Sequence, residues 1–577
     1  MLPEFASKTR IIGTGLIVLF IVLSMGATRR KAPVFDETLH LFAGYAYLKW
    51  GDFGINPEHP PLAKMLAALP LVALNLNHQG VERQERDYAQ ANRGHAWELA
   101  NRFLFLNNDA ERIFLPAKCV MVFLAVILGL FIFAWTRELF GPAAAMVALF
   151  IYCLDPNILA HAPLVHTDIP FALCFFAASY FFWRSLYDLS WLNLLLTALF
   201  YALAAITKFS FVTILPLWLL LGLIRIFSKA PQRSRITDPS SVNTLWGKTT
   251  LLIVLIGSVL LAGYLVIWLT YGLRFDTAPY ARAELSAVSA AAKTPGLESI
   301  ARMASEYLFL PNSWIFGITD AFRSLDRPAY LLGEIKTDGF WLYFPIVFLA
   351  KTPMPTLLLL LAGILSLLFL RHRLRGAAFL LLPVSIFFLA AVWSHINIGL
   401  RHILPIYPFL FVWLGGVAME LWKWENRYAK LSLAALAIWL IGSTVKTYPD
   451  YLAFFNEAAG GPNNGHNILV DSNLDWGQDL KGLKVWMERN KVEKIQLAYF
   501  GMANPRYYKI AADLLPGTLF SQWDDPQVAA RQPSHAAISA TYLMGYNLAD
   551  RNAYARFRQQ QPVAVIGHSI WVYELPH

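Results

Sequence analysis

The sequence predicts a polytopic α-helical membrane protein with a small α/β domain outside the membrane at its C-terminal end. The first observation is composition: 57% of the 577 residues are hydrophobic and 15% are charged, with a mean hydropathy of +0.46. Such values exclude an ordinary soluble protein. The second is a series of long apolar runs that stops near residue 446, after which short β-type runs follow. The net charge of +10 does not imply a nucleic-acid partner, because Lys and Arg accumulate in cytoplasmic loops.

The apolar runs predict about eleven membrane spans, because a spanning helix needs about 20 mostly apolar residues. The first run is followed by Arg29-Arg30-Lys31 and not by a small-residue cleavage site, so we interpret it as a span. The expected spans are residues 11–28, 113–135, 143–160, 169–186, 191–207, 210–227, 250–271, a broken stretch 341–370, 377–393, 402–419 and 431–446.

Basic residues predict which ends of these spans are cytoplasmic. Lys and Arg gather before the first span, in the loop 225–249, at 371–375 and at 423–430, which places the N-terminus in the cytoplasm. The basic triplet at 29–31 is the exception. The membrane domain is then residues 1–446. Its external loops include 29–112 and 272–340, and the tail 447–577 is external too. The chain has no Asn-X-Ser/Thr sequon, which favours a bacterial inner membrane with these segments in the periplasm.

The first external loop predicts two amphipathic helices on the membrane surface, separated by the breaker "INPEHPP". The first of them begins with "FDETLH". Asp36 and His40 are four residues apart and share a helix face, and Glu37 is within reach of His40. Two carboxylates are also common in the first turn of an exposed helix. Because apolar neighbours press this helix onto lipid or protein, we regard the acidic pair as a candidate site.

Further charged side chains are predicted at the same membrane face. "EHPPLAK" supplies Glu58, His59 and Lys64, which also suit a capped surface helix with a snorkelling lysine. "HTDIP" supplies Asp168, which would equally serve as a helix cap before Pro170.

Cations complete this set. "ITK" places Lys208 between two spans, where the alternative is again a snorkelling lysine. "GLRHILPIYPF" places Arg401 and His402 at the start of a span, where headgroups would also hold an arginine. The planar guanidinium of Arg401 suits a phosphate. If each of these residues were incidental, we would expect them on both faces of the membrane.

The tail contains the β-type runs "NILVD", "KIQLAYFG", "HAAISAT" and "PVAVIGHSIWVYEL", with "DLKGLKVWMERN" as a helix. This mixture predicts the small α/β domain. The acidic spacing in "DSNLDWGQDL" does not fit a calcium loop, and we interpret the segment as a turn and a helix start. The three cysteines, Cys119, Cys153 and Cys174, lie in apolar runs and predict no disulfide framework.

The motifs "FDETLH", "EHPPLAK", "HTDIP" and "ITK" resemble those of polyprenyl-phosphate-sugar-dependent glycosyltransferases of the C-type (GT-C) superfamily. The resemblance is to the protein O-mannosyltransferases (family 39) and the lipid A aminoarabinose transferases, and covers roughly residues 10–415. It implies a cell-envelope enzyme with an undecaprenyl- or dolichyl-phosphate-sugar donor and a glycan, lipid or protein acceptor. It also implies Asp36 as base with Glu37 beside it, Asp168 as second acidic position, and Lys208 and Lys64 near the donor phosphate. The inserted trefoil domain of eukaryotic protein O-mannosyltransferases is missing, which counts against a protein acceptor.

The bare residues fit this chemistry. A lipid phosphate is already an acidic leaving group, so one base suffices, unlike in a glycosidase with two working carboxylates. Asp36 fits the base, and Lys208, Arg401, Lys64, His59 and His402 are candidates for donor binding. Glu37, Glu58 or His59 could hold a divalent metal, although their spacing does not demand one. The alternative function is a transporter or flippase of an anionic or lipid-linked substrate, which usually has charges at the bilayer midplane and inverted repeats.

Overall fold

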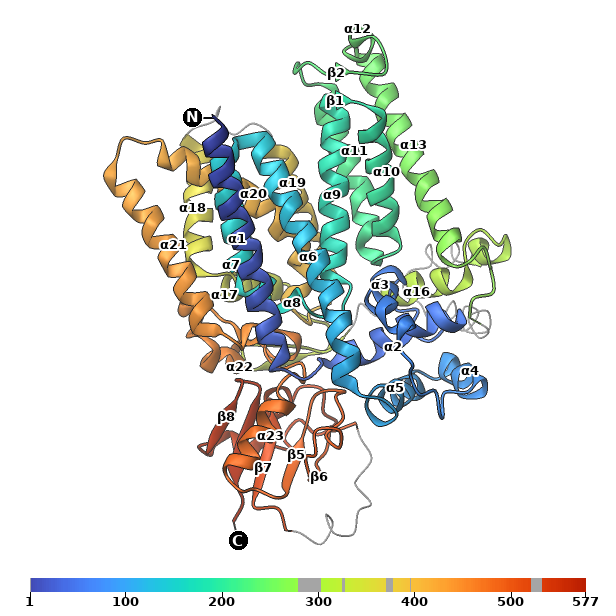
Figure 1. Ribbon diagram of the computed structural model, residues 1–577, viewed down its shortest axis with the longest axis vertical. Coiled ribbons are helices and arrows are strands. Elements are labelled where there is room, and N and C mark those ends of the chain that lie inside the picture. Colours follow the sequence, from blue (N-terminus) through green and yellow to red (C-terminus); the bar gives the residue numbers. More distant parts are fainter. Residues whose placement is uncertain are drawn as a thin grey trace.

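The computed structural model describes residues 2–278, 302–323, 327–369, 377–394, 396–519 and 532–576. A bundle of long helices forms one end of the molecule and a small sheet domain the other (Figure 1). The N-terminus lies at the end of the bundle that is remote from the sheet domain (Figure 1). The predicted fold class, a polytopic helical membrane protein with a small C-terminal α/β domain, is confirmed.

Seven helical segments among the described residues are long and apolar enough to span a membrane, and a bent pair makes an eighth. The seven are α1 (Leu2–Arg29), α6 (Ala110–Phe140), α9 (Asp168–Tyr187), η3 (Phe209–Thr213) with α11 (Ile214–Ile226), α13 (Leu245–Thr270), η4 (Leu400–Ile406) with α20 (Tyr407–Trp422), and α21 (Arg427–Thr447). The bent pair is α17 (Tyr343–Lys351) and α18 (Met354–Phe369), which meet at 113° beside Pro353, as the broken stretch predicted.

The other three expected spans are shorter apolar helices: α7 (Pro142–Leu154), α10 (Trp191–Ala205) and α19 (Ala377–Trp393). The expected span 143–160 is divided because Asp155 ends α7 and caps α8 (Pro156–His161). Its carboxylate accepts hydrogen bonds from the backbone N–H groups of Asn157 and Ile158. Within the described ranges, the number of full-length spans is therefore lower than the expected eleven. The arginines at 371–375 lie outside the described residues.

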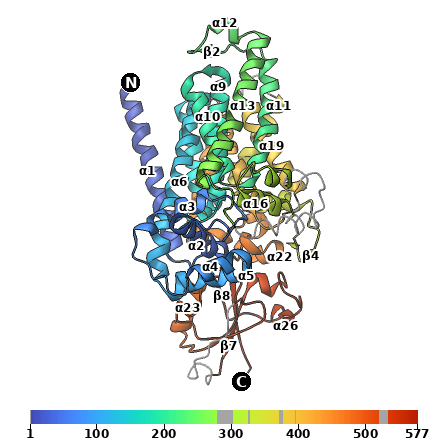
Figure 2. The ribbon, with the colours of Figure 1, turned by 90° about the vertical axis from the view of Figure 1, so that its right-hand side faces the viewer.

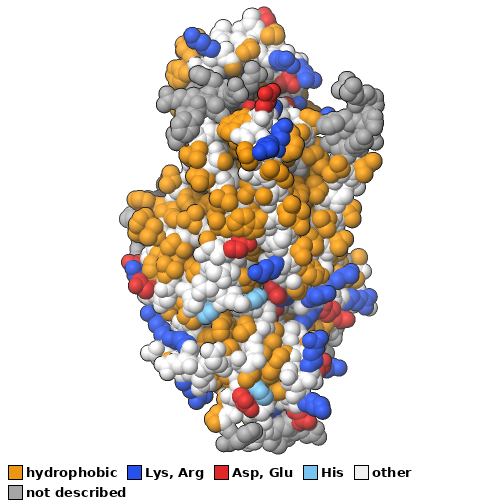
Figure 3. Space-filling model, turned by 90° about the vertical axis from the view of Figure 1, so that its left-hand side faces the viewer, with side chains coloured by type: hydrophobic (Ala, Val, Ile, Leu, Met, Phe, Trp, Pro, Cys, Tyr) orange, Lys and Arg blue, Asp and Glu red, His pale blue; other side chains and the backbone are white. Residues whose placement is uncertain are grey.

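The surface of the bundle matches a membrane environment. A broad band of hydrophobic side chains crosses the middle of one face, and charged side chains lie mostly above and below it (Figure 3). Exposed apolar residues of α1 and α21 include Ile12, Val22 and Ile438. Such a surface would be unstable in water and is stable in lipid.

The first loop folds into short helices at the end of the bundle that faces the sheet domain (Figure 2). They are α2 (Phe35–Trp50), α3 (Leu62–Ala68), η1 (Leu69–Ala73), α4 (Arg83–Ala91), α5 (Arg93–Asn101) and η2 (Arg102–Leu106). α2 is more enclosed than an amphipathic surface helix, since every residue from Glu37 to Tyr47 is buried. α2 therefore belongs to the interior of the protein.

Short elements connect these parts. They are β1 (Asp188–Leu189), β2 (Arg233–Ser234), α12 (Pro239–Val242), α16 (Asn312–Arg323), β3 (Ala329–Leu331), β4 (Glu334–Lys336), η5 (Tyr451–Ala453), η6 (Glu457–Ala459), η7 (Pro462–Asn464), α22 (Gly465–Ile468) and η8 (Asp471–Asn473). The run "NILVD" is thus not a strand: α22 ends within it, and Leu469 and Val470 are buried beneath the bundle.

The sheet domain contains one five-stranded mixed sheet with strand order β6-β5-β7-β9-β8. Its strands are β5 (Ile495–Ala498), β6 (Ala512–Leu514), β7 (His535–Ser539), β8 (Ala564–Ile566) and β9 (Ile570–Glu574), with helices α23 (Leu480–Arg489), α25 (Ala540–Leu543) and α26 (Ala555–Arg558). β5 is parallel to β6 and β7, whereas β9 is antiparallel to β7 and β8. The other three predicted β-type runs contain β5, β7, β8 and β9, and the predicted helix is α23, whereas β6 and α26 lie outside the predicted runs.

We expect Gly44→Ala to destabilise the protein, because α2 and α3 touch at this glycine. A Cβ atom at Gly44 would lie 2.0 Å from the carbonyl oxygen of Lys64, so the two helices would have to separate. Overpacking of this kind costs about 1–3 kcal/mol. Thermal unfolding of the purified protein in detergent would measure the effect. Gly257→Ala in α13 is the control, since nothing lies within 4 Å of a Cβ atom there; equal melting temperatures for both variants would contradict the prediction.

Candidate active site

A cavity of about 270 Å³ lies where the first loop meets the membrane helices. Most of the site residues predicted from sequence line it, together with apolar and cationic neighbours. The lining residues are Phe35, Asp36, His40, Asn56, Glu58, His59, Arg93, Trp97, His166, Lys208, Ala321, Arg327, Ile396, Ile398, Arg401 and His402. The cavity therefore joins segments that are hundreds of residues apart in the chain.

Five ionisable side chains form a continuous line along this cavity, which we call the charge chain: Arg401, Asp36, His166, Asp168 and Lys208. Arg401 Nη1 donates to Asp36 Oδ2 at 2.9 Å, and His166 Nε2 lies 3.1 Å from the same oxygen. His166 Nδ1 is 2.5 Å from Asp168 Oδ2. Lys208 Nζ donates to Asp168 Oδ1 at 2.5 Å. His166 thus lies between the two carboxylates, and each carboxylate has a cation on its other side.

Helix ends position these side chains. Asp36 lies in the first turn of α2, and Asp168 is the first residue of α9. Both places favour a carboxylate, because backbone N–H groups and the helix dipole stabilise negative charge there. Lys208 lies in the break between α10 and η3, and Arg401 lies in the 3₁₀ turn before α20. Each of these four side chains therefore comes from the end of a helix or from the segment directly beside one.

The electrostatic environment keeps Asp36 ionised. Burial raises the pKa of its carboxyl group, but the Arg401 guanidinium and the hydrogen bond from His166 outweigh this effect and hold the pKa well below its usual range. The side chain is nevertheless 24% exposed, so it is accessible from the cavity, whereas Asp168 is 2% exposed. Of the two carboxylates, Asp36 is the one that a bound molecule can reach.

The C-terminal segment completes the site, a role that the sequence did not reveal. Trp476, from "DSNLDWGQDL", stacks beneath Arg401, whose Cζ lies 4.3 Å from the centre of the indole. The backbone N–H of Phe35 donates to the carbonyl of Trp476 at 2.8 Å. Lys351 Nζ donates to the carbonyls of Asn473 and Leu452 and ties the same segment to the membrane helices. The turn predicted from sequence therefore supports Arg401 and Phe35, two residues that line the cavity, from behind.

The Glu37 carboxylate has different partners from the Asp36 carboxylate. Its carboxylate accepts from the backbone N–H groups of Val34 and Val165 and from Lys118 Nζ at 3.1 Å. Glu37 is fully buried, and Lys118 is 5% exposed. Glu37 therefore joins the start of α2 to α6 and to the loop that carries His166. Sequence analysis missed Lys118 because it lies within the apolar run of α6.

Lys64 and the remaining candidates differ in how they face the cavity. Lys64 Nζ donates to the carbonyl and side-chain oxygens of Asn56 and to the Tyr47 hydroxyl, and it does not line the cavity. Burial lowers the pKa of Lys64 to about 7. Its contacts fit a role in holding the "INPEHPP" turn.

Glu58, His59 and His402 do line the cavity. Glu58 pairs with Arg327, whose Nη2 lies 3.2 Å away and which the sequence analysis also missed. Burial lowers the pKa of His59 well below its usual value. Arg327 adds a further cation to those predicted around the cavity.

We expect Lys118→Met to lower the thermal stability strongly, because it leaves the Glu37 carboxylate buried and unpaired. Removing one partner of a buried ion pair costs about 3–5 kcal/mol. The double variant Glu37→Gln/Lys118→Met should recover part of the loss, since the amide oxygen can still accept one backbone N–H. Thermal unfolding in detergent is the measurement.

Arg83→Met is the matched control, because Arg83 is 87% exposed and lies 3.7 Å from Asp87. If Lys118→Met unfolds at the same temperature as Arg83→Met, the structural role of Glu37 is wrong.

Comparison with known proteins supports the predicted resemblance. Residues 95–261, which include Asp168 and Lys208, match the family model described as dolichyl-phosphate-mannose-protein mannosyltransferase. No curated protein matches the chain. The resemblance to C-type glycosyltransferases is thus confirmed for this segment by a family model, whereas Asp36, Lys64 and Arg401 lie outside it.

Solved structures similar to this chain include ArnT from Cupriavidus metallidurans. Its undecaprenyl-phosphate-bound form has 12% identity and a TM-score of 0.43, and covers 97% of each chain. Its apo form has 13% identity and a TM-score of 0.44, and covers 97% of this chain and 98% of that one. The Archaeoglobus fulgidus oligosaccharyltransferase has 14% identity and a TM-score of 0.43, and covers 90% of this chain and 61% of its own. With identities and TM-scores this low, residues of this chain are not matched one by one to residues of those structures.

Proposed function

We propose that the protein transfers a sugar from a polyprenyl-phosphate-linked donor to a hydroxyl group, with inversion at the anomeric carbon. The observation that carries the proposal is the charge chain, in which a partly accessible carboxylate and two cations line one cavity at an end of a helical membrane bundle. The family match over residues 95–261 supports a glycosyltransferase. The acceptor is a glycan, a lipid or a protein.

Asp36 is the proposed general base. Its carboxylate takes the proton of the acceptor hydroxyl as the oxygen attacks the anomeric carbon. The bond between that carbon and the phosphate oxygen breaks on the opposite side, and the lipid phosphate leaves with the bonding electrons. Arg401 and Lys208 stabilise the negative charge that develops on this phosphate.

Donor binding must rearrange the ion pairs that the structure shows at the cavity. Arg401 is committed to Asp36 and Lys208 to Asp168. A carboxylate with a strongly lowered pKa is a weak base. We propose that the donor phosphate draws Arg401 away from Asp36, which raises the pKa of that carboxyl group and activates it only when donor is present. His166 then holds Asp36 in place.

We further propose that the cavity faces the periplasm. The N-terminus and the basic loop around α12 lie at the opposite end of the bundle (Figure 1). Because basic residues favour the cytoplasmic side, the first loop and the sheet domain would be external. The membrane domain is then residues 1–446 and the external domain residues 447–577.

We expect Asp36→Asn to reduce transfer by about 10²–10⁴-fold without unfolding the protein, because the amide keeps the shape but cannot accept the proton. The test incubates purified full-length protein with several polyprenyl-phosphate sugars and analyses the acceptor fraction by mass spectrometry. Asp87→Asn in α4 is the control for loss of one exposed carboxylate. Wild-type rates in Asp36→Asn would remove Asp36 as the base, and no turnover with any donor would favour a transporter.

We expect Arg401→Lys to raise the KM for the donor by about 10–100-fold with a smaller effect on kcat. Lysine keeps the charge but loses the planar fork that binds two phosphate oxygens and stacks on Trp476. Steady-state kinetics with varied donor concentration measures the two parameters separately. An unchanged KM would place the phosphate elsewhere.

A further inference from the structure

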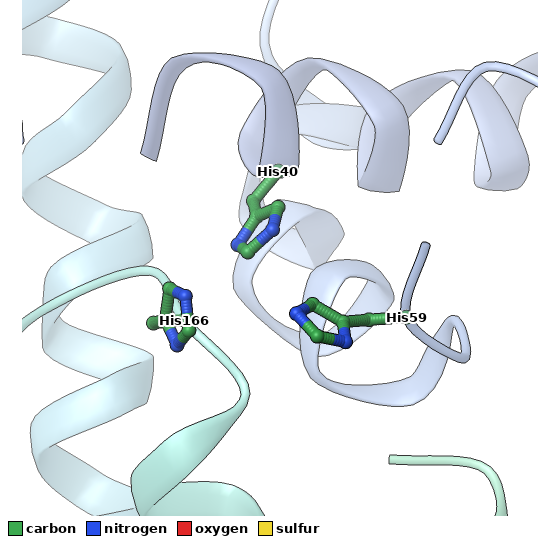
Figure 4. Close-up of side chains that lie close together, drawn as sticks. All are labelled: His40, His59 and His166. Carbon is green, nitrogen blue, oxygen red and sulfur yellow. The ribbon is translucent and has the colours of Figure 1, made fainter. Parts of the chain in front are cut away.

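Three histidines from separate segments converge beside the charge chain. His40 comes from α2, His59 from the turn before α3, and His166 from the loop before α9, and their rings face one another (Figure 4). One ring nitrogen of each lies within 4.8 Å of the others. All three residues line the cavity. They are grouped by the fold and not by proximity in sequence.

Hydrogen bonds to the outside of the cluster fix two of these rings. His40 Nδ1 lies 3.2 Å from the carbonyl oxygen of Val165. A carbonyl only accepts, so Nδ1 carries the hydrogen and Nε2 keeps a free lone pair. Metal-binding histidines typically donate their second nitrogen to a carbonyl or carboxylate in this manner.

His166 is held through Nε2, which lies 2.6 Å from Arg401 Nη1 and 3.1 Å from Asp36 Oδ2. Its Nδ1 is buried 2.5 Å from Asp168 Oδ2 and has no hydrogen-bond partner among the described residues. In the tautomer with a lone pair on Nε2, that lone pair accepts from Arg401. A metal ion would take the place of the Arg401 guanidinium at this nitrogen.

His59 also has an unfilled bonding position. Its Nδ1 is buried and has no hydrogen-bond partner among the described residues. A buried polar atom without a partner costs free energy, which a ligand would recover. His59 is also the least enclosed of the three rings, since it is half-buried in a turn.

We propose that His40, His59 and His166 bind a divalent transition-metal ion, with Zn²⁺ as the best fit. Imidazole nitrogens suit zinc, and zinc sites that take part in reactions have three protein ligands and one open position. Tetrahedral Zn–N bonds of about 2.1 Å require nitrogens about 3.4 Å apart. The three nitrogens, which lie within 4.8 Å of one another, would therefore move closer on binding, and the open position would face the cavity that Asp36 also lines.

The charges around the cluster are compatible with a dication. Asp36 and Asp168 offset Arg401 and Lys208, so the surroundings carry no net charge from these four groups. A bound Zn²⁺ makes the cavity cationic, which favours an anionic ligand. It also releases Arg401 from His166. The inference extends beyond the proposed sugar transfer, and metal binding is measured without any donor.

The test uses the full-length protein in detergent, purified with an affinity tag that contains no histidine. Metal is removed with a chelator, Co²⁺ alone is titrated in, and the visible absorption of tetrahedral cobalt is recorded. We expect about one Co²⁺ per chain, displaced by Zn²⁺, and a loss of affinity greater than 100-fold in His59→Ala. His402→Gln is the matched control, because it removes a histidine from the same cavity but not from the cluster, and it should retain binding.

A second measurement guards against misfolding of the variant. Zn²⁺ should raise the unfolding temperature of the metal-free wild type and not that of His59→Ala, whose metal-free form should unfold at the wild-type metal-free temperature. Absence of tetrahedral cobalt absorption in the wild type would overturn the proposal, and so would equal Co²⁺ affinity in His59→Ala and the wild type.

Discussion

Neutralisation of buried cations at one end of the helical bundle is the constraint on which the site depends. Arg401 and Lys208 are each 7% exposed, and a charge so enclosed is costly unless an opposite charge lies beside it. Asp36 and Asp168 provide that charge at hydrogen-bond distance. The same pairing keeps two cations at the cavity, so the arrangement that stabilises the protein also leaves positive charge that can interact with an anion.

Two neighbouring carboxylates of α2 have different surroundings. Glu37 turns into the interior, where Lys118 and two backbone N–H groups fix the start of α2. Asp36 turns into the cavity and meets Arg401. Because consecutive residues of a helix point in different directions, a rigid anchor and an accessible carboxylate can be adjacent in sequence. The anchor holds the helix that presents the carboxylate.

The sequence predicts the helices, the broken span and several ionisable residues of the cavity, because apolar periodicity and element ends are local properties. Asp36, Asp168, Lys208 and Arg401 could be assigned to one membrane face by counting spans. The ion pairs could not be predicted from the sequence, since the orientation of the Glu37 side chain depends on Lys118 in another helix. Trp476 was missed for the same reason: its segment has the composition of a turn, and only the docked structure places it under Arg401. The division at Asp155 was missed because a capping aspartate resembles any polar residue within an apolar run.

The separation of partners along the chain sets the order in which the protein can be completed. Glu37 and Lys118 are 81 positions apart, so this pair can form soon after the first helices leave the ribosome. Asp36 and Arg401 are 365 positions apart, and Trp476 follows later still. Until those residues are synthesised and inserted, α2 can be anchored while the Asp36 carboxylate has no cation beside it. An incomplete chain can therefore acquire the scaffold of the site, but its charge balance is completed only when membrane insertion is nearly finished.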